Sequence, residues 1–171
     1  MKISITANTS WYIYNFRRNT IRTLISAGHE VIAVSPDSDY KDKLESLGCK
    51  YFQIKMQRWG KNPFVDLLTF YDFYKIFKKE GVNLTLNFTP KNNIYATFAA
   101  SLLNIKVINN IAGLGVIFIQ NNIFSKLVAF LYRTSQKKLT LYFFKTMKIK
   151  NCFLISILLL KNNVTVYLDP V

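Results

Sequence analysis

The start of the chain, Met1–Pro36, constrains the fold more than any other segment because it has the pattern of a strand, a helix and a second strand. Short runs rich in β-branched residues mark the two strands at Lys2–Ala7 and Glu30–Ser35. Between them, apolar residues recur at helical spacing until Gly28 ends the helix. Parallel strands need a crossover helix of this kind, so the sequence predicts a β-α-β unit.

The segment after the first strand, Asn8–Arg18, is predicted to be a loop, and it contains no glycine. A dinucleotide-binding turn needs glycines that let the backbone approach a pyrophosphate, so this is not a GxGxxG loop. In open α/β folds such a loop lies at the carboxyl edge of the sheet, where ligands bind. Aromatic rings, amides and guanidinium groups are therefore what this segment offers to a ligand.

Strands and helices continue to alternate beyond Pro36, which predicts an α/β fold with a Rossmann-like, doubly wound parallel sheet of five strands. The further predicted strands are Lys50–Lys55, Val82–Phe88 and Lys106–Asn110. The predicted helices are Lys41–Leu47, Pro63–Lys79, Asn92–Leu103 and Ile123–Lys138, with a loop over Ile111–Asn122.

The chain of 171 residues has a formal net charge of +14. Nucleic acid is disfavoured as the partner because the Lys and Arg residues are scattered and no nucleic-acid-binding motif is present. An anionic membrane surface or a phosphorylated substrate would suit this charge, and solubility alone is the alternative. Cys49 and Cys152 lack metal-ligand spacing and no signal peptide is visible, so we expect a reduced, cytoplasmic protein without metal or cofactor.

Four segments together resemble the N-terminal domain of bacterial family 4 glycosyltransferases, in the subgroup that extends lipid-linked saccharides. They are 2–54, Arg58–Leu67, Asn87–Ala99 and Val107–Phe118, and the resemblance covers residues 1–138. It implies a GT-B enzyme of two Rossmann-like domains, usually metal-independent and retaining. In such enzymes the N-terminal domain holds the acceptor, here a saccharide on a polyprenyl diphosphate, and the C-terminal domain binds the nucleotide-sugar. The donor-binding motif of that second domain has no counterpart in this sequence.

The regular alternation ends after Lys138, and residues 139–171 form a tail unlike the continuation of the family. One nucleotide inserted after the Lys138 codon permits a reading that resembles the missing family segment, which predicts a frameshift and an out-of-frame tail. The alternative is a divergent tail that anchors the chain to a membrane, although its apolar run, Phe153–Leu160, is too short to cross a bilayer. We expect Leu139–Phe144 to add an edge strand, and Lys145 onward to be poorly ordered or helical.

Three groups of polar residues at the predicted carboxyl edge are candidates for binding the acceptor. The first group follows the opening strand and comprises Asn8, Trp11, Asn15 and Arg17. Arginine offers a bidentate fork to a diphosphate, and an aromatic face can stack on a sugar ring. Packing of the helix against the sheet is the alternative role for Trp11 and Phe16, and Arg18 is expected to be solvated.

The second group, Thr89, Lys91 and Asn93, opens a helix whose N-terminus would attract an anion, and a plain N-cap at Thr89 or Asn92 is the alternative. The third group, Asn109, Gly113 and Gly115, follows the fifth strand, in a loop that faces the interdomain cleft in the family. A tight structural turn is the alternative there. Arg58–Lys61 could contact a membrane or the lipid acceptor, or be a solvated loop, and His29 is expected to be structural.

The sequence shows no carboxylate pair, metal-ligand cluster or nucleophile with its base, so we assign no catalytic residue. We expect the acceptor-binding half of a glycosyltransferase that is inactive without its donor domain. A stand-alone carbohydrate- or membrane-surface-binding module, or one half of a split enzyme, is the alternative.

Overall fold

The computed structural model describes residues 1–57, 62–111, 123–135, 141–144 and 166–168. In these residues the chain forms a parallel sheet of seven strands in the order β3-β2-β1-β4-β5-β6-β7. The strands are β1 (Lys2–Thr6), β2 (Glu30–Ser35), β3 (Lys50–Gln53), β4 (Leu84–Phe88), β5 (Lys106–Ile111), β6 (Leu141–Phe144) and β7 (Val166–Leu168). The helices are α1 (Ser10–Ser26), α2 (Lys41–Glu45), α3 (Pro63–Glu80), α4 (Pro90–Leu102) and α5 (Ile123–Ser135).

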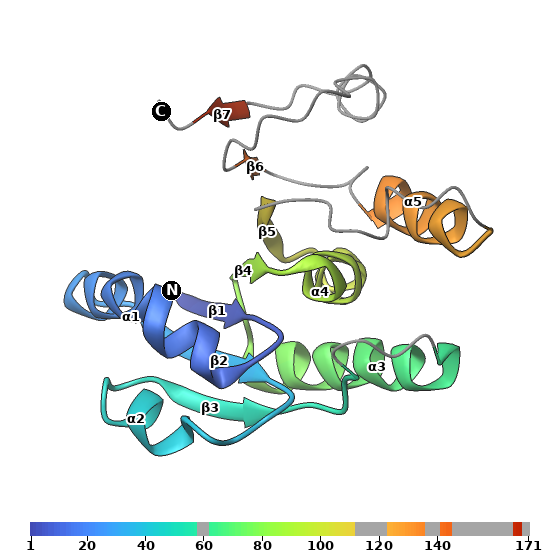
Figure 1. Cartoon of the computed structure of the whole chain (residues 1–171). Helices are drawn as coiled ribbons and strands as arrows, with labels where there is room; N and C mark the ends of the chain where they lie inside the picture. Colours follow the sequence, from blue (N-terminus) through green and yellow to red (C-terminus); the bar gives the residue numbers. More distant parts are fainter. Residues whose placement is uncertain (58–61, 112–122, 136–140, 145–165, 169–171) are drawn as a thin grey trace.

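Helices cover both faces of the sheet, with α1 and α2 on one face and α3, α4 and α5 on the other (Figure 1). Successive residues of β2 point to opposite faces of the sheet, and both faces are covered, which explains why residues 31–34 are all apolar. Val31 and Ala33 belong to the core beneath α1 and α2. Ile32 and Val34 belong to the core beneath α3 and α4, where they join Phe73. The predicted doubly wound α/β sheet is thus confirmed.

The bounds of α3 follow from residues at its two ends. Asn62 accepts a hydrogen bond from the Phe64 N–H at 3.0 Å, and Pro63 occupies the first turn, where its missing N–H is not needed. At the other end Gly81 adopts φ 65°, a left-handed conformation that ends the helix. The predicted helix over Pro63–Lys79 is therefore confirmed almost to the residue.

The prediction of a loop over Asn8–Arg18 was wrong, because α1 begins at Ser10. Thr9 is the N-cap, and its side-chain oxygen accepts from the Tyr12 N–H at 3.1 Å. No glycine or proline interrupts the helix that follows, so helical structure can extend back to the cap. The aromatic and polar side chains assigned to a loop are consequently held on a rigid helix. Similarly, α4 begins at Pro90 rather than at Asn92.

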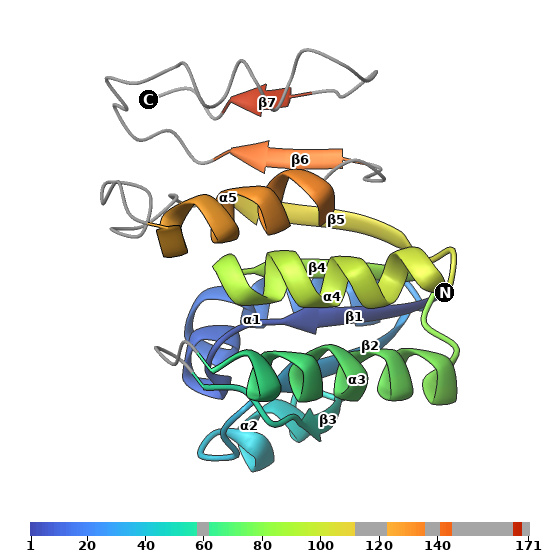
Figure 2. The ribbon, with the colours of Figure 1, turned by 90° about the vertical axis from the view of Figure 1, so that its right-hand side faces the viewer.

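Beyond α5, the described residues form two further strands (Figure 2). Leu141–Phe144 pairs in parallel with β5, which confirms the predicted strand in this segment. It is not the edge strand, because Val166–Leu168 pairs with it as β7, where poorly ordered or helical chain was expected. Residues 145–165 lie outside the described part of the chain, and the domain boundary at Lys138 stays a prediction.

Candidate functional site

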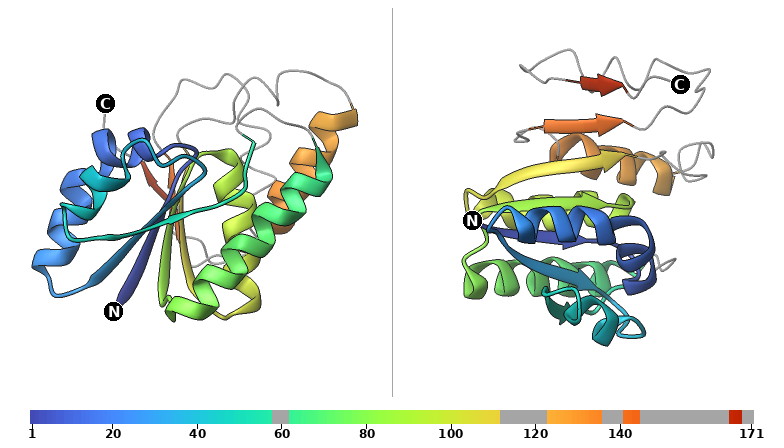
Figure 3. Two further views of the ribbon diagram at one scale, coloured as in Figure 1. Left: turned by 90° about the horizontal axis from the view of Figure 1, so that it is seen from below. Right: turned by 90° about the vertical axis from the view of Figure 1, so that its left-hand side faces the viewer.

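The parallel strands all end at one edge of the sheet, and α1, α3 and α4 begin there (Figures 2 and 3). This carboxyl edge is where open α/β sheets bind ligands. Two helix starts dominate it in the described residues: the start of α1 after β1 and the start of α4 after β4. These starts bring together the first and second predicted groups of site residues.

Arg17 connects the two helix starts. Its guanidinium carbon lies 4.1 Å from the centre of the Phe88 ring, at the end of β4, and its Nη2 donates to the Tyr12 hydroxyl at 3.2 Å. The Nε of Arg17 is buried and has no hydrogen-bond partner among the described residues. The aromatic contact fixes the plane of the guanidinium, so the buried Nε–H points where no acceptor lies among the described residues.

Trp11 and Phe16 lie on the outer side of α1. Their side chains are 48% and 57% exposed, so the alternative that they pack the helix against the sheet is wrong. The two rings meet edge to face with their centres 5.5 Å apart. Asn15 is exposed on the same helix and donates its side-chain N–H to the Trp11 carbonyl at 2.9 Å. Arg18 is exposed, as expected.

Asn8 lies beside an open cavity of about 550 Å³ at the ends of β1 and β2. The cavity is lined by Asn8, Thr9, Trp11, Pro36, Asp37, Asp39, Tyr40 and Met56. The Asp37 carboxylate accepts from the Ser10 N–H at 3.1 Å and from the Ser10 hydroxyl. A carboxylate therefore already occupies the N-terminus of α1, and a ligand phosphate at that position would meet negative charge.

Thr89 joins β4 to α4 in a strained conformation. Its φ of 81° and ψ of 147° lie in a region that glycine adopts readily and a β-branched residue does not. It stands at the N-cap position, but its side chain makes no capping hydrogen bond, so the plain N-cap alternative is wrong for Thr89. The Thr89 Oγ1 is buried without a partner among the described residues. Asn92 donates to the Phe88 carbonyl at 3.3 Å and is not the cap either.

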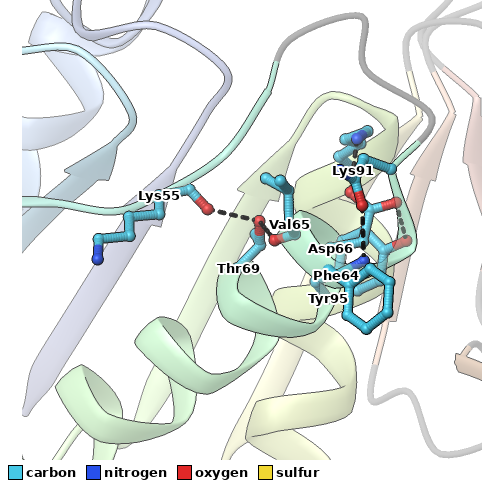
Figure 4. Close-up of polar contacts among 8 residues, drawn as sticks. Lys55, Phe64, Val65, Asp66, Thr69, Lys91 and Tyr95 are labelled. Carbon is cyan, nitrogen blue, oxygen red and sulfur yellow. Dashed lines mark hydrogen bonds and ion pairs between the residues drawn. The ribbon is translucent and has the colours of Figure 1, made fainter.

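Lys91 lies in the first turn of α4 and pairs with Asp66 of α3 at 2.6 Å. The other Asp66 oxygen accepts from the Tyr95 hydroxyl at 2.9 Å (Figure 4). Burial, together with this carboxylate, raises the pKa of the Tyr95 phenol. The predicted cation is present at the helix N-terminus, and the same pair also holds α4 against α3.

Asn109 lies inside the sheet in a buried polar network. The Asn87 amide donates to Asn109 Oδ1 at 2.9 Å, and the Asn109 amide donates to Thr97 Oγ1 at 3.0 Å. Thr6 completes the connection, since its hydroxyl donates to Asn87 Oδ1 at 2.8 Å. Asn109 is fully buried in this arrangement. Sequence reasoning did not single out Asn87, although an amide inside a buried apolar strand is a recognisable signal.

Asn93 is also buried, at the inner side of α4. Its amide donates to the Tyr132 hydroxyl of α5 at 2.9 Å and to the Asn110 carbonyl of β5 at 3.2 Å. Burial raises the pKa of Tyr132 to about 12. The Asn110 side-chain oxygen is buried and has no partner among the described residues. Two of the predicted site residues, Gly113 and Gly115, lie outside the described part of the chain, as does Arg58–Lys61.

Within the described ranges, no three His, Cys, Asp or Glu side chains gather so that they could hold a metal ion. A helix long and apolar enough to cross a membrane is also absent from those ranges. The chemistry visible at the carboxyl edge is that of binding, through a guanidinium group, hydroxyls, amides and exposed aromatic rings.

Comparisons with known proteins agree with this architecture. A curated relative, N,N'-diacetylbacillosaminyl-diphospho-undecaprenol alpha-1,3-N-acetylgalactosaminyltransferase from Campylobacter jejuni, is 29% identical over 138 residues. The aligned region covers 80% of this chain but only 37% of that protein, so the chain spans little more than a third of its relative.

Solved structures show the same fold at low sequence identity. The UDP-GlcNAc 2-epimerase from Methanocaldococcus jannaschii superposes with a TM-score of 0.62 at 19% identity, over 97% of this chain and 45% of that one. Sucrose-phosphate synthase from Thermosynechococcus elongatus gives 0.63 at 12% identity, over 97% and 47%. These likenesses identify the Rossmann-like N-terminal half of a GT-B fold.

The sequence model of the glycosyl transferase 4-like family matches residues 2–145. This match spans the β-α units that build the carboxyl edge, and it includes β6. The chain therefore belongs to family 4 of the glycosyltransferases, as the resemblance of its motifs predicted.

Proposed function

We propose that the chain is the acceptor-side domain of a glycosyltransferase that transfers a sugar from a nucleotide-sugar to a saccharide linked to a polyprenyl diphosphate. Family membership supports the reaction class, and the name of the Campylobacter jejuni relative describes transfer to a saccharide on diphospho-undecaprenol. Because the chain spans 37% of that relative, we assign nucleotide-sugar binding to a domain beyond the described residues. The family match favours this proposal over a stand-alone carbohydrate- or membrane-surface-binding module.

One observation carries the proposal: polar atoms without partners gather around Phe88 at the end of β4. Arg17 stacks on the Phe88 ring, Thr89 follows it in the chain, and Asn110 is its register partner on β5. Arg17 Nε, Thr89 Oγ1 and Asn110 Oδ1 are all buried without partners among the described residues. An unsatisfied buried polar atom costs about 1–3 kcal/mol, and the Thr89 backbone adds a strain of similar size.

A saccharide diphosphate would satisfy these groups. Sugar hydroxyls both donate and accept, which suits a set containing a guanidinium N–H, a hydroxyl and an amide oxygen. The remaining Arg17 donors suit a diphosphate oxygen, and the exposed Trp11 and Phe16 rings suit the apolar face of a sugar or the first units of a polyprenyl chain. The other predicted residues that would position or extend this site are Asn8, Asn15, Lys91, Asn93 and Asn109. The polyprenyl chain would remain in a membrane, so we also propose peripheral contact with the inner face of an anionic cytoplasmic membrane.

The proposal is tested by titrating the 171-residue chain with a soluble acceptor analogue, a disaccharide on a short-chain polyprenyl diphosphate, in a calorimeter. We expect saturable binding without sugar transfer when a nucleotide-sugar is added. Replacing Arg17 with Met should weaken binding at least tenfold, about 1.4 kcal/mol, because a charged hydrogen bond to the diphosphate is lost.

The matched control is Arg18→Met, which removes the same charge from the neighbouring exposed position and should leave affinity unchanged. An absence of binding by the wild-type chain, or equal losses in the two variants, would contradict the proposal. Sugar transfer by the chain alone would contradict the assignment of the donor site to another domain.

A further inference from the structure

The cavity at the ends of β1 and β2 has the opposite charge to the chain as a whole. The protein has a formal net charge of +14, but none of the described residues that line the cavity is Lys, Arg or His. Two carboxylates, those of Asp37 and Asp39, line it instead. Carboxylates repel phosphates and other anions at short range, even where the charge of the whole chain attracts them. The cavity is therefore unsuited to a diphosphate.

The two carboxylates differ in what they already bind. Asp37 accepts from the N–H and the hydroxyl of Ser10, and both of its oxygens take part. The Asp39 side chain is exposed and makes no hydrogen bond or ion pair with the other described residues. One available carboxylate is too few for a metal site, so the cavity suits a ligand that donates hydrogen bonds.

The rest of the lining supplies the other contacts that a sugar needs. The Trp11 side chain is 48% exposed, and an aromatic face packs against the apolar face of a sugar ring. Asn8 supplies an amide, which both donates and accepts. Lys43 lies over the Tyr40 ring, 4.4 Å from its centre, but does not line the cavity. The volume of about 550 Å³ lies in the range of sites that hold small molecules.

A row of aromatic rings joins the cavity to Arg17. The centre of the Trp11 ring lies 5.5 Å from that of Phe16, which lies 5.1 Å from that of Tyr12. The Tyr12 ring lies 6.3 Å from the Phe88 ring, over which the Arg17 guanidinium is stacked. The row thus has a guanidinium group at one end and carboxylates at the other. A ligand along the row is oriented by this difference, with its anionic part at Arg17 and an uncharged part in the cavity.

We propose that the cavity holds the saccharide part of the acceptor, and that Asp39 makes the site selective for saccharides without acidic groups. Asp39 accepts hydrogen bonds from sugar hydroxyls, and its negative charge repels the carboxylate of a uronic acid. The inference deepens the proposed function, on which it rests for the diphosphate at Arg17. It adds the direction in which the acceptor lies and the chemical class of its sugars. Asp39 is in this assignment a specificity-determining residue and not a catalytic one.

Calorimetric titration of the 171-residue chain with a matched pair of analogues tests the inference. Both analogues carry a disaccharide on the same short-chain polyprenyl diphosphate. They differ only at C6 of the distal sugar, which is a hydroxymethyl group in one and a carboxylate in the other. We expect the neutral analogue to bind about tenfold more tightly, because it places no like charge beside Asp39. Salt should reduce the difference, since the cavity is open to solvent.

Two carboxylate substitutions separate Asp39 from the general charge of the chain. Asp39→Asn keeps an acceptor oxygen but removes the charge, and it should bring the two affinities to within about threefold of each other. The change should come mainly from tighter binding of the acidic analogue. The matched control is Asp42→Asn, which removes the same charge from an exposed residue of α2 that does not line the cavity. It should leave the difference between the analogues unchanged.

Trp11→Ala shows whether the sugars lie at the cavity. It should weaken both disaccharide analogues about fivefold, because a stacked aromatic face is lost, and leave the affinity for a polyprenyl diphosphate without sugar unchanged. Equal weakening of all three ligands would overturn the placement of the saccharide.

The selectivity and the proposed function fail in different ways. Equal affinity of the wild-type chain for the two analogues, or a difference that persists in Asp39→Asn, would overturn the inference. The proposed function would stand in that case if Arg17→Met still weakened both analogues. An absence of binding by all of the diphosphate ligands would contradict the proposed function and this inference together.

Discussion

The two helix starts at the carboxyl edge differ in how their polar groups are satisfied. At the start of α1, Thr9 caps the Tyr12 N–H and the Asp37 carboxylate accepts both the N–H and the hydroxyl of Ser10. At the start of α4, Thr89 has a strained backbone and makes no capping bond. Both helices follow central strands of the same sheet, so topology alone does not explain the difference.

The comparison teaches that the protein itself completes the α1 start, whereas the α4 start keeps unpartnered polar atoms that the proposed acceptor would satisfy. The α1 start is built for stability, and a carboxylate from the β2–α2 connection closes it. At the α4 start, the Thr89 backbone is strained and unpartnered polar atoms lie near Arg17. Both features lower the stability of the free domain. Substitutions on the two sides should therefore affect stability in opposite directions.

The largest effect on stability is expected at the α1 start, which the Asp37 carboxylate closes. Asp37→Ala leaves the N–H and hydroxyl of Ser10 without their acceptor and should lower the free energy of unfolding by about 2 kcal/mol. Urea unfolding followed by circular dichroism measures it. Asp39→Ala, at an exposed neighbouring carboxylate, is the control and should change stability by less than about 0.5 kcal/mol. Equal effects would show that Asp37 does not close the helix.

At the α4 start, by contrast, a substitution should stabilise the domain. Thr89→Gly relieves a φ of 81° and removes an unpartnered hydroxyl, so the free energy of unfolding should rise by about 1 kcal/mol while the acceptor analogue binds more weakly. Asn104→Gly is the matched control, since Asn104 also has a positive φ of 55° but in a region that asparagine tolerates. Its gain should be smaller and its acceptor affinity unchanged. A destabilised Thr89→Gly would break the comparison, because it would mean that the threonine side chain supports the helix.

The smallest effect is the loss of stability at alkaline pH that we expect from Tyr51, which contacts the α1 start through Asp37. The Tyr51 hydroxyl contacts the Ser35 hydroxyl at 2.8 Å and donates to the Asp37 carbonyl, and burial raises the pKa of Tyr51 to about 12. The unfolded phenol loses its proton near pH 10, whereas the folded one does so near pH 12, so this contribution to stability is complete below pH 10 and is lost as the pH rises to about 12.

Unfolding measured between pH 9 and 12 tests this prediction. The difference in stability between the wild-type chain and Tyr51→Phe should shrink above pH 10. The control Tyr71→Phe alters an exposed phenol, and its difference should not vary in this way. A stability difference for Tyr51→Phe that does not change with pH would show that the contacts of the Tyr51 hydroxyl do not keep it neutral.

The sheet was largely predictable from local sequence, because each central strand is a short β-branched run and each helix has a clear end such as Gly81. The start of α1 was missed because an aromatic segment without glycine was interpreted from its loop position rather than from the N-cap Thr9. The strand at Val166–Leu168 was missed because three residues carry almost no periodic signal.

The candidate site was predictable by position but not by contact. The residues at the ends of β1 and β4 could be named, since topology brings them to one edge. The stacking of Arg17 on Phe88, the closure of α1 by Asp37 and the pairing of Lys91 with Asp66 join residues distant in sequence. The local sequence does not predict the strained backbone at Thr89, because a threonine before a proline is common in an extended segment.

The line of polar side chains through the sheet has a consequence for how the strands find their alignment. Thr6, Asn87 and Asn109 are register partners on β1, β4 and β5, and hydrogen bonds join them in that order. Strands that are apolar on both faces could slide past one another and still bury most of their side chains. A slip of one residue here would press an amide against hydrocarbon without a partner. The asparagines therefore favour one strand register while the chain folds, because a sheet with a shifted register would bury an amide without a partner.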